Sequence, residues 1–393
     1  MLAPGGLAPD GGLRLRPGVP PVARLQFSAS LFLDRLSAIY GPSNTGKTLA
    51  VKNAILLLAP HVNQIVVVSP TEVSNRAYEG FVDPACIHSR PYLPDPEKPE
   101  KDDGAKGVVR FMETIWKRQE ALVQTYEAAN RRDVLMRLFQ RIPRRHFREG
   151  TALIRAIDER RKKAIHRISA QAAAAGTPPG RRSEEIKKVN DSFERILVAT
   201  FKRFIAPHFA ALWAEPGLPD DERLSLNYLE FNPRLLLILD DCAAELKPHF
   251  KKDIFRKFFY QGRHCKVTTL LVFQDDTDLD ANLRKNAFVS LYTDPIVCTA
   301  NFERKSNNFA KATVQYAQEA IPRVFVKTRK LAYIRDDPSR RHFYHVEYPV
   351  PEPPKEPFGG PATRELLEEV RATGATFDRK NPYFERLAVA SRR

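Results

Sequence analysis

The sequence lacks any uninterrupted apolar run of the length that a membrane span needs. A membrane-spanning helix needs about 20 consecutive apolar residues, whereas the apolar runs here, such as residues 65–68 and 235–239, have the length of a β-strand. Residues 1–21 are rich in Gly and Pro and have no apolar centre typical of a signal peptide. We therefore expect a protein that has no membrane partner and is not exported.

Cysteine is also scarce. The four cysteines of the 393 residues are far apart and form no C-x-x-C pair; they are Cys86, Cys242, Cys265 and Cys298. This spacing argues against both a zinc site and a disulfide framework. Reduced thiols in the cytoplasm or the nucleus are the expected state.

Acidic residues are outnumbered by basic ones. Lys and Arg total 63 against 47 Asp and Glu, which gives a formal net charge of +16. Residues 140–205 hold 17 Lys or Arg and 7 Asp or Glu, a local net charge of +10. Such a surplus favours a polyanionic partner, nucleic acid first and acidic membrane or protein surfaces second. Three interpretations stay open for this stretch: a solvated helix face, a contact with DNA, or a contact with a partner protein.

A nucleotide-binding motif lies near the amino terminus. An apolar strand that ends at Tyr40 is followed by a loop and by an apolar helix. The loop matches the P-loop pattern G-x-x-x-x-G-K-[ST] with Gly41, Pro42, Ser43, Asn44, Thr45, Gly46, Lys47 and Thr48. Backbone N–H groups at such a turn converge on phosphate oxygens. We expect all eight residues to bind ATP, with Lys47 at the β- and γ-phosphates and the Thr48 hydroxyl on Mg²⁺.

Two carboxylates follow a second apolar strand. Asp240 and Asp241 come directly after residues 235–239, in the manner of a Walker B motif. The carboxyl ends of buried strands point toward the crevice in which open α/β sheets bind ligands. We expect Asp240 to hold Mg²⁺ and Asp241 to orient and deprotonate the attacking water. Gln274 ends the next strand, residues 267–274, and would hold that water or sense the γ-phosphate if the two strands are neighbours.

Strands alternate with helices along the chain, which indicates an α/β fold with a mostly parallel, twisted sheet. We expect a core formed by residues 25–91 and 234–347, interrupted by a basic, mainly helical insertion at residues 92–233. Residues 1–24 would be a flexible arm, and residues 348–393 a proline-rich linker and tail.

Individual elements follow from the same patterns. The predicted helices cover residues 108–130, 133–142, 151–174, 183–213, 249–262 and, in the tail, 363–373. The Gly and Pro residues of 176–180 would make a helical hairpin of the third and fourth of these. Further strands are predicted at residues 287–292, 323–327 and 330–335, and a short strand or turn at residues 25–34.

The order of these motifs resembles that of one group of viral enzymes. After the P-loop and Asp240-Asp241 come a helix ending in Gly262-Arg263-His264, the strand ending in Gln274, and Leu283-Arg284-Lys285-Asn286. This order is similar to that of the genome-packaging ATPases of large double-stranded DNA viruses. These are enzymes of the poxvirus and iridovirus type in the FtsK/HerA superfamily, and adenovirus packaging ATPases are more distantly similar.

The resemblance implies a RecA-like P-loop core with the additional strand of that class, and Mg²⁺-dependent ATP hydrolysis. Subunits would form a homo-oligomeric ring around double-stranded DNA and translocate the viral genome into a preformed capsid. Such rings usually need an arginine from the neighbouring subunit; both Arg263 and Arg284 fit, and Arg284 is slightly preferred. Besides DNA, the partner would be a capsid or portal vertex protein. The protein would act in the infected host cell, in a cytoplasmic virus factory or the nucleus, or with the virion.

The resemblance is confined to about residues 36–70 and 234–335, and it says nothing about residues 71–233. Two other functions stay open. One is a different P-loop nucleic-acid motor, such as a helicase or a remodelling ATPase. The other is a packaging or scaffold protein that binds ATP without turnover. The presence of Asp240, Asp241 and Gln274, the residues expected for hydrolysis, argues against this second function.

Overall fold

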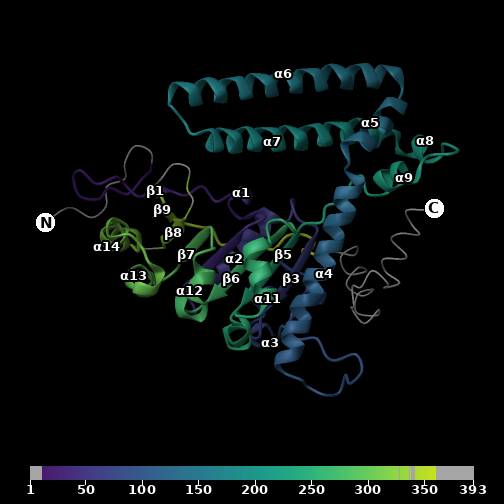
Figure 1. The fold of residues 1–393 in the computed structure, drawn as a ribbon. Helices are drawn as coiled ribbons and strands as arrows, with labels where there is room; N and C mark the ends of the chain where they lie inside the picture. Colours follow the sequence, from purple (N-terminus) through teal and green to yellow (C-terminus); the bar gives the residue numbers. More distant parts are fainter. Residues whose placement is uncertain (1–10, 327, 336, 338–340, 360–393) are drawn as a thin grey trace. The chain divides into compact units, whose positions relative to one another are not determined.

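In the computed structural model, the described residues are 11–326, 328–335, 337 and 341–359 (Figure 1). Contacts within the chain divide them into two units. The first unit comprises the described residues up to 123 and from 232 onward, and the second comprises residues 124–231.

The first unit is built on a mixed, mostly parallel β-sheet (Figure 1). Among the described residues the strand order is β1-β9-β8-β7-β2-β6-β5-β3-β4. Strand β8 runs against its neighbours β7 and β9, and the other adjacent pairs are parallel. The α/β class predicted from the sequence is therefore confirmed. The strands are β1 (Ala23–Arg24), β2 (Leu36–Tyr40), β3 (Gln64–Val68), β4 (Ile87–His88), β5 (Leu235–Asp240), β6 (Val267–Phe273), β7 (Val289–Tyr292), β8 (Lys330–Ile334) and β9 (Phe343–Val346).

The central strands are apolar throughout because both faces of the sheet are covered. Every residue of β2, β3, β5 and β6 is buried. One face packs against α1 (Ala29–Phe32) and α2 (Lys47–Leu58). The other face packs against the first half of α4 (Ala105–Ala129) and against α11 (Asp253–Arg256), α13 (Pro295–Glu303) and α14 (Lys311–Val324). The first unit is thus a three-layer α/β/α arrangement.

Three short helices complete this unit: α3 (Glu72–Asn75), α10 (Ala243–Leu246) and α12 (Ala281–Arg284). The predicted single helix over residues 249–262 is instead divided into a 3₁₀ turn (Lys247–His249), α11 and a π-helical turn (Lys257–Gln261). In place of the predicted strand or turn at residues 25–34, residues 29–32 form the helical turn α1.

The strand predicted at residues 323–327 is wrong, because Arg323 and Val324 end helix α14. The run Val324-Phe325-Val326 has strand-like composition. However, the helix buries Ala317, Ala320, Ile321 and Val324, whose spacing of three and four residues forms one continuous face. Burial of that helix face on the sheet outweighs the local preference of residues 324–326 for a strand.

The described part of the amino-terminal segment is packed, which differs from the flexible arm predicted over residues 1–24. Leu13 and Val22 pair in an antiparallel bridge and are 1% and 0% exposed. Strand β1 adds to the sheet by parallel pairing with β9. Residues 1–10 and the predicted tail helix 363–373 lie outside the described residues.

The second unit is helical. Its helices are α5 (Arg132–Arg141), α6 (Arg144–Ala174), α7 (Pro179–Ile205), α8 (Phe209–Trp213) and α9 (Asp220–Asn227). Helices α6 and α7 run side by side as a hairpin (Figure 1), joined at residues 175–178. The insertion was predicted over residues 92–233, but residues 92–123 belong with the sheet because α4 buries Phe111, Met112 and Trp116 against it.

Among the described residues, one helical stretch, Pro179–Trp213, is long and apolar enough to cross a membrane by length and composition alone. Leu197, Phe201 and Ile205 of this stretch are buried in the apolar cluster of the second unit. In its most apolar window 28% is buried, and a single helix of this kind is weak evidence for a membrane span.

Candidate functional site

The P-loop joins strand β2 to helix α2. The loop turns through positive φ angles at Asn44 (64°) and Gly46 (99°). Gly41 leaves no room for a side chain, because a Cβ atom there would lie 2.0 Å from Thr293 Oγ1 and 2.8 Å from Thr45 Oγ1. The loop leads into a helix of 12 residues, whose first backbone N–H groups have no intrahelical partner and attract phosphate.

Lys47 is the first residue of α2 and lies along this loop. It is 6% exposed, and its Nζ donates hydrogen bonds to the carbonyl oxygens of Gly41 (2.7 Å) and Pro42 (3.1 Å). These bonds keep the ammonium group at the loop, which is where it would have to lie to contact a phosphate. The adjacent Thr48 is half-buried, and no hydrogen bond ties its hydroxyl to another described residue.

Thr293, directly after β7, fastens the loop to the neighbouring strand. Its Oγ1 hydrogen-bonds to Tyr40 O (3.1 Å) and to the Thr45 hydroxyl (2.6 Å). Lys330 on β8 donates to Thr293 O (3.0 Å), and its Cε would lie 3.7 Å from a Cβ atom on Gly46. Burial lowers the pKa of Lys330. A second lysine therefore lies beside the P-loop.

The first Walker B carboxylate is held by a buried tyrosine. Asp240, the last residue of β5, is 5% exposed, and its Oδ2 accepts a hydrogen bond of 2.7 Å from the hydroxyl of Tyr78. Burial raises the pKa of Asp240 to about 6; the neighbouring Asp241 carboxylate also raises it, whereas the Tyr78 bond and Lys47 act in the opposite direction. Tyr78 fixes one oxygen of Asp240 and leaves the other for a different partner.

Asp241 and Gln274 lie at the same edge of the sheet as the P-loop. Strand β6 lies between β2 and β5, so the strands that precede Asp241 and Gln274 are neighbours, as the prediction for Gln274 required. Asp241 N donates to Val272 O (3.0 Å), and Gly41 N donates to Phe273 O (3.2 Å). The Oδ1 atom of Asp241 is buried without a hydrogen-bond partner among the described residues. The Gln274 side chain is exposed.

A third carboxylate lies near these two. Glu72, the first residue of α3, accepts a hydrogen bond from Tyr78 N through Oε1 (2.9 Å). Its Oε2 is buried with no hydrogen-bond partner among the described residues, and burial raises the pKa of Glu72. Glu72 and Asp240 are thus connected through one tyrosine. The sequence did not predict Glu72, Tyr78, Thr293 or Lys330 as site residues, because none of them belongs to a recognisable motif.

The two candidate arginines have very different surroundings. Arg284 is 8% exposed, and its Nη1 donates to Asp276 O (2.6 Å) and Oδ2 (2.7 Å). Asp276 is fully buried and also pairs with Arg304 (3.0 Å) and accepts from Asn307 (3.1 Å). This network occupies Arg284 within its own chain. The slight preference for Arg284 as the residue that reaches a neighbouring subunit therefore has no support in its geometry.

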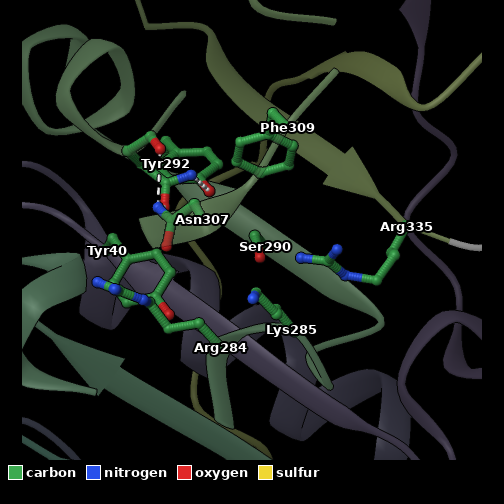
Figure 2. Close-up of a pocket in the computed structure, with 9 residues that line it drawn as sticks. Tyr40, Arg284, Lys285, Ser290, Tyr292, Asn307, Phe309 and Arg335 are labelled. Atoms are coloured by element: carbon green, nitrogen blue, oxygen red, sulfur yellow. Dashed lines mark hydrogen bonds between the residues drawn. The ribbon is translucent and has the colours of Figure 1, made fainter. Parts of the chain in front are cut away.

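A small pocket beside Arg284 does not change this conclusion (Figure 2). Tyr40, Ser290 and Arg335 are among the residues that line it, and Arg335 points toward Ser290 and Lys285. Its volume of about 10 Å³ is enough for about one water molecule. The pocket is too small for a nucleotide or a phosphate.

Arg263 is exposed and precedes strand β6, so it lies at the edge of the sheet opposite the P-loop. Its Nε hydrogen-bonds to the His264 ring (3.3 Å). The seven residues of β6 span roughly 23 Å at about 3.3 Å per residue. Arg263 is therefore out of reach of the phosphate site of its own chain.

The donor set at the P-loop edge fits ATP and Mg²⁺. Close packing of Gly41 against Thr293 and Thr45 fixes the start of the loop, and the buried Oδ1 atom of Asp241 has no hydrogen-bond partner among the described residues. Carboxylate and hydroxyl oxygens are the ligands that Mg²⁺ prefers. Asp240 and Thr48 would hold the ion, and the residues of the P-loop would hold the phosphates.

The chain is similar in sequence to proteins of one virus, although it matches no protein-family profile. A protein of the Tick/Malawi/Lil 20-1 isolate of African swine fever virus, named "Uncharacterized protein B354L", is 42% identical over 368 residues, which are 94% of this chain and 97% of that protein. The B354L protein of the Warthog/Namibia isolate is 41% identical over the same shares of both chains.

Two solved structures show only a remote likeness. The cytoplasmic domain of the Type VII secretion ATPase EccC from Thermomonospora curvata is 13% identical with a TM-score of 0.33, and the match covers 93% of this chain and 30% of EccC. The plasmid coupling protein TrwB, in complex with a GTP analogue, is 13% identical with a TM-score of 0.34, over 92% of this chain and 99% of TrwB. TM-scores this low do not establish a shared fold. The identity with B354L extends over nearly the full length of both chains, and the protein belongs to the B354L family of African swine fever virus.

Proposed function

We propose that the protein is a P-loop ATPase that uses ATP hydrolysis to move double-stranded DNA. The observation that carries the proposal is the convergence of the P-loop, Asp240, Asp241 and Gln274 on one sheet edge, with β6 between β2 and β5. The net charge of +16 supports a polyanionic partner. The order of motifs supports the more specific role of packaging a viral genome into a capsid, and the relatives from African swine fever virus agree with a viral origin.

Each site residue would have a separate part in the hydrolysis of ATP. The amino end of α2 and Lys47 bind the phosphates and offset their charge. Asp241 accepts the proton of a water molecule whose oxygen attacks the γ-phosphorus, while Gln274 orients that water. The bond between the γ-phosphorus and the bridging oxygen breaks, and ADP and inorganic phosphate are released. Asp240 and Thr48 would hold Mg²⁺, which would supply positive charge at the phosphates.

DNA packaging would place the protein in the infected cell, in a cytoplasmic virus factory or the nucleus. Subunits would assemble as a ring around the duplex and dock onto a capsid or portal vertex protein. In such a ring the exposed Arg263 is the better candidate for a contact with the nucleotide of a neighbour, because Arg284 is bound to Asp276.

The decisive experiment compares ATP hydrolysis with and without duplex DNA. We expect duplex DNA to stimulate hydrolysis and Asp241→Asn to abolish it, because an amide cannot accept the proton of water. Asp253→Asn is the matched control. Asp253 is the first residue of α11, which comes before β6 in the chain and leads to the sheet edge opposite the P-loop, so this variant should retain ATP hydrolysis. Equal rates with and without DNA, together with no DNA binding at about 100 mM salt, would refute the motor function.

Two outcomes would identify the other candidate functions. Separation of the strands of a forked substrate would indicate a helicase. Binding of ATP without any Mg²⁺-dependent phosphate release would indicate a scaffold protein that does not turn over its nucleotide.

Tyr78→Phe tests the support of the metal site. The phenylalanine keeps the ring but removes the hydroxyl that donates to Asp240, and loss of such a supporting bond typically costs about 10–100-fold in metal affinity or activity. We expect the Mg²⁺ concentration for half-maximal hydrolysis to rise by about 10-fold. Tyr316→Phe, which removes a hydroxyl bonded to Pro20 O, should leave it unchanged. An unaltered Mg²⁺ requirement in Tyr78→Phe would show that the tyrosine has only a structural role.

A further inference from the structure

Helix α6 carries a set of exposed cations that have no partner among the described residues. Six exposed side chains of this helix form no ion pair or hydrogen bond with other described residues. Other basic residues of α6 do form ion pairs, such as Lys162 with Asp158 (3.1 Å) and Arg145 with Glu149 (3.3 Å). We call the unpaired set the α6 cations; they are Arg144, Arg148, Arg155, Arg160, Lys163 and Arg167.

The α6 cations lie away from the hairpin core. Residues three, four or seven positions apart share one side of a helix, and this spacing joins Arg144, Arg148 and Arg155 in one row. A second row joins Arg160, Lys163 and Arg167. The buried residues of α6, such as Gly150 and Ile157, face inward instead. Gly150 has no space for a side chain, because a Cβ atom there would lie 2.6 Å from the Phe139 ring.

The spread of the α6 cations along the helix suits a double helix. Arg144 and Arg167 are 23 positions apart, a rise of about 35 Å at 1.5 Å per residue, which equals roughly 10 base pairs at 3.4 Å each. Unpaired arginine and lysine side chains on a rigid rod can neutralise several phosphates at once. Each neutralised phosphate releases counterions, which is the main source of sequence-independent affinity.

The composition of the same face argues against other polyanions. Proteins that bind single strands stack bases on aromatic side chains, but the one Phe of α6, Phe147, is half-buried against Phe139 (5.1 Å between ring centroids). Helices that lie on membranes need a broad apolar face opposite their charges. Between the α6 cations, the exposed apolar residues are Ala152, Ala156 and the single large side chain Leu153 (38% exposed), which do not make a broad apolar face.

We propose that the α6 cations bind the phosphate backbone of double-stranded DNA without reading its sequence. The proposal rests on the proposed function for its choice of partner, but it concerns binding and not hydrolysis. It assigns a role to the part of the chain for which the sequence motifs provide none.

The test replaces four of the α6 cations in the full-length protein, as Arg148→Ala, Arg155→Ala, Arg160→Ala and Lys163→Ala together. Binding of a labelled duplex of about 30 base pairs is measured as salt is varied, because the slope of log K against log salt falls by about 0.9 per lost phosphate contact. If each of the four cations contacts one phosphate, we expect the slope to become shallower by about 3.6, and the affinity to fall at least about 10-fold at 100 mM salt.

The control removes the same charge from exposed lysines of the first unit, as Lys251→Ala, Lys257→Ala, Lys305→Ala and Lys311→Ala together. It should retain most of the duplex affinity. An equal loss of duplex affinity in both variants would overturn the proposal, because the affinity would then depend on net charge alone. An unchanged duplex affinity in the α6 variant would also overturn the proposal. So would a variant that loses binding only to phosphatidylserine vesicles or only to single-stranded oligothymidylate.

The result is separable from the proposed function. If the α6 variant loses duplex binding while duplex DNA never stimulates hydrolysis by the unmodified protein, the binding site stands and the motor function fails. If duplex DNA stimulates both proteins equally, at the same DNA concentration, the motor stands and the α6 site fails. Unchanged hydrolysis in the absence of DNA shows that the ATPase unit of the variant is folded.

Discussion

Lys47→Ala is expected to reduce ATP hydrolysis by at least about 10²-fold, the usual effect of removing one donor that stabilises charge developing in a transition state. Lys47 Nζ is held at the P-loop by the carbonyl oxygens of Gly41 and Pro42, so alanine removes the cation from the point where phosphate charge would develop. The rate of phosphate release at saturating ATP and Mg²⁺ measures the effect.

Lys257→Ala is the matched control for this change. Lys257 is exposed in the π-helical turn that precedes β6, near the sheet edge opposite the P-loop, and its replacement should leave the rate unchanged. A Lys47→Ala protein that hydrolyses ATP at the rate of the unmodified protein would disprove the assignment of the P-loop as the catalytic nucleotide site.

Arg284→Ala is expected to lower the free energy of unfolding by about 3 kcal/mol, because removal of one partner of a buried ion pair leaves the other charge uncompensated. Asp276 is fully buried and would keep Arg304 and Asn307 but lose its shortest contact. Chemical denaturation measures the loss. A stability equal to that of the unmodified protein would mean that Arg284 is free to act elsewhere, such as at a neighbouring subunit.

Arg263→Ala should behave in the opposite way. Its side chain is exposed, so the unfolding free energy should change by no more than about 0.5 kcal/mol, while hydrolysis falls by roughly 10³-fold if the arginine acts on a neighbour. Mixing Arg263→Ala with Lys47→Ala subunits is the sharper measurement. Two inactive proteins should regain activity when mixed, because some interfaces then combine an intact lysine with an intact arginine; no recovery would contradict action between subunits.

The long apolar strands were predictable because burial on both faces demands continuous apolar runs. Strands β2, β3, β5 and β6 occur where those runs predicted them. Strands β1 and β4 have two residues each and were not predicted, since two residues are too few to show a period of two.

The helical hairpin was predictable for a similar reason. Its two arms have long periodic patterns, and Gly176 and Pro178 separate them. The boundary of the insertion was less predictable, because α4 is one unbroken helix whose first half covers the sheet. Local periodicity cannot reveal which partner an apolar helix face will meet.

The sequence by itself determined that the P-loop pattern, Asp240-Asp241 and Gln274 follow apolar strands, because each belongs to a short strand-and-loop pattern that is complete within a few residues. Only the tertiary structure decided their surroundings. The hydroxyl of Tyr78 meets Asp240 across 162 positions of the chain, and Thr293 meets Thr45 across 248.

The same distinction separates the two arginines. Each lies in a short motif that admits the same role, so the sequence supplied no reason to choose between them beyond a slight preference. Packing buries Arg284 against Asp276 and leaves Arg263 in solvent. Burial and pairing depend on which segments the sheet brings together, and that is a property of the folded chain, not of any local stretch of it.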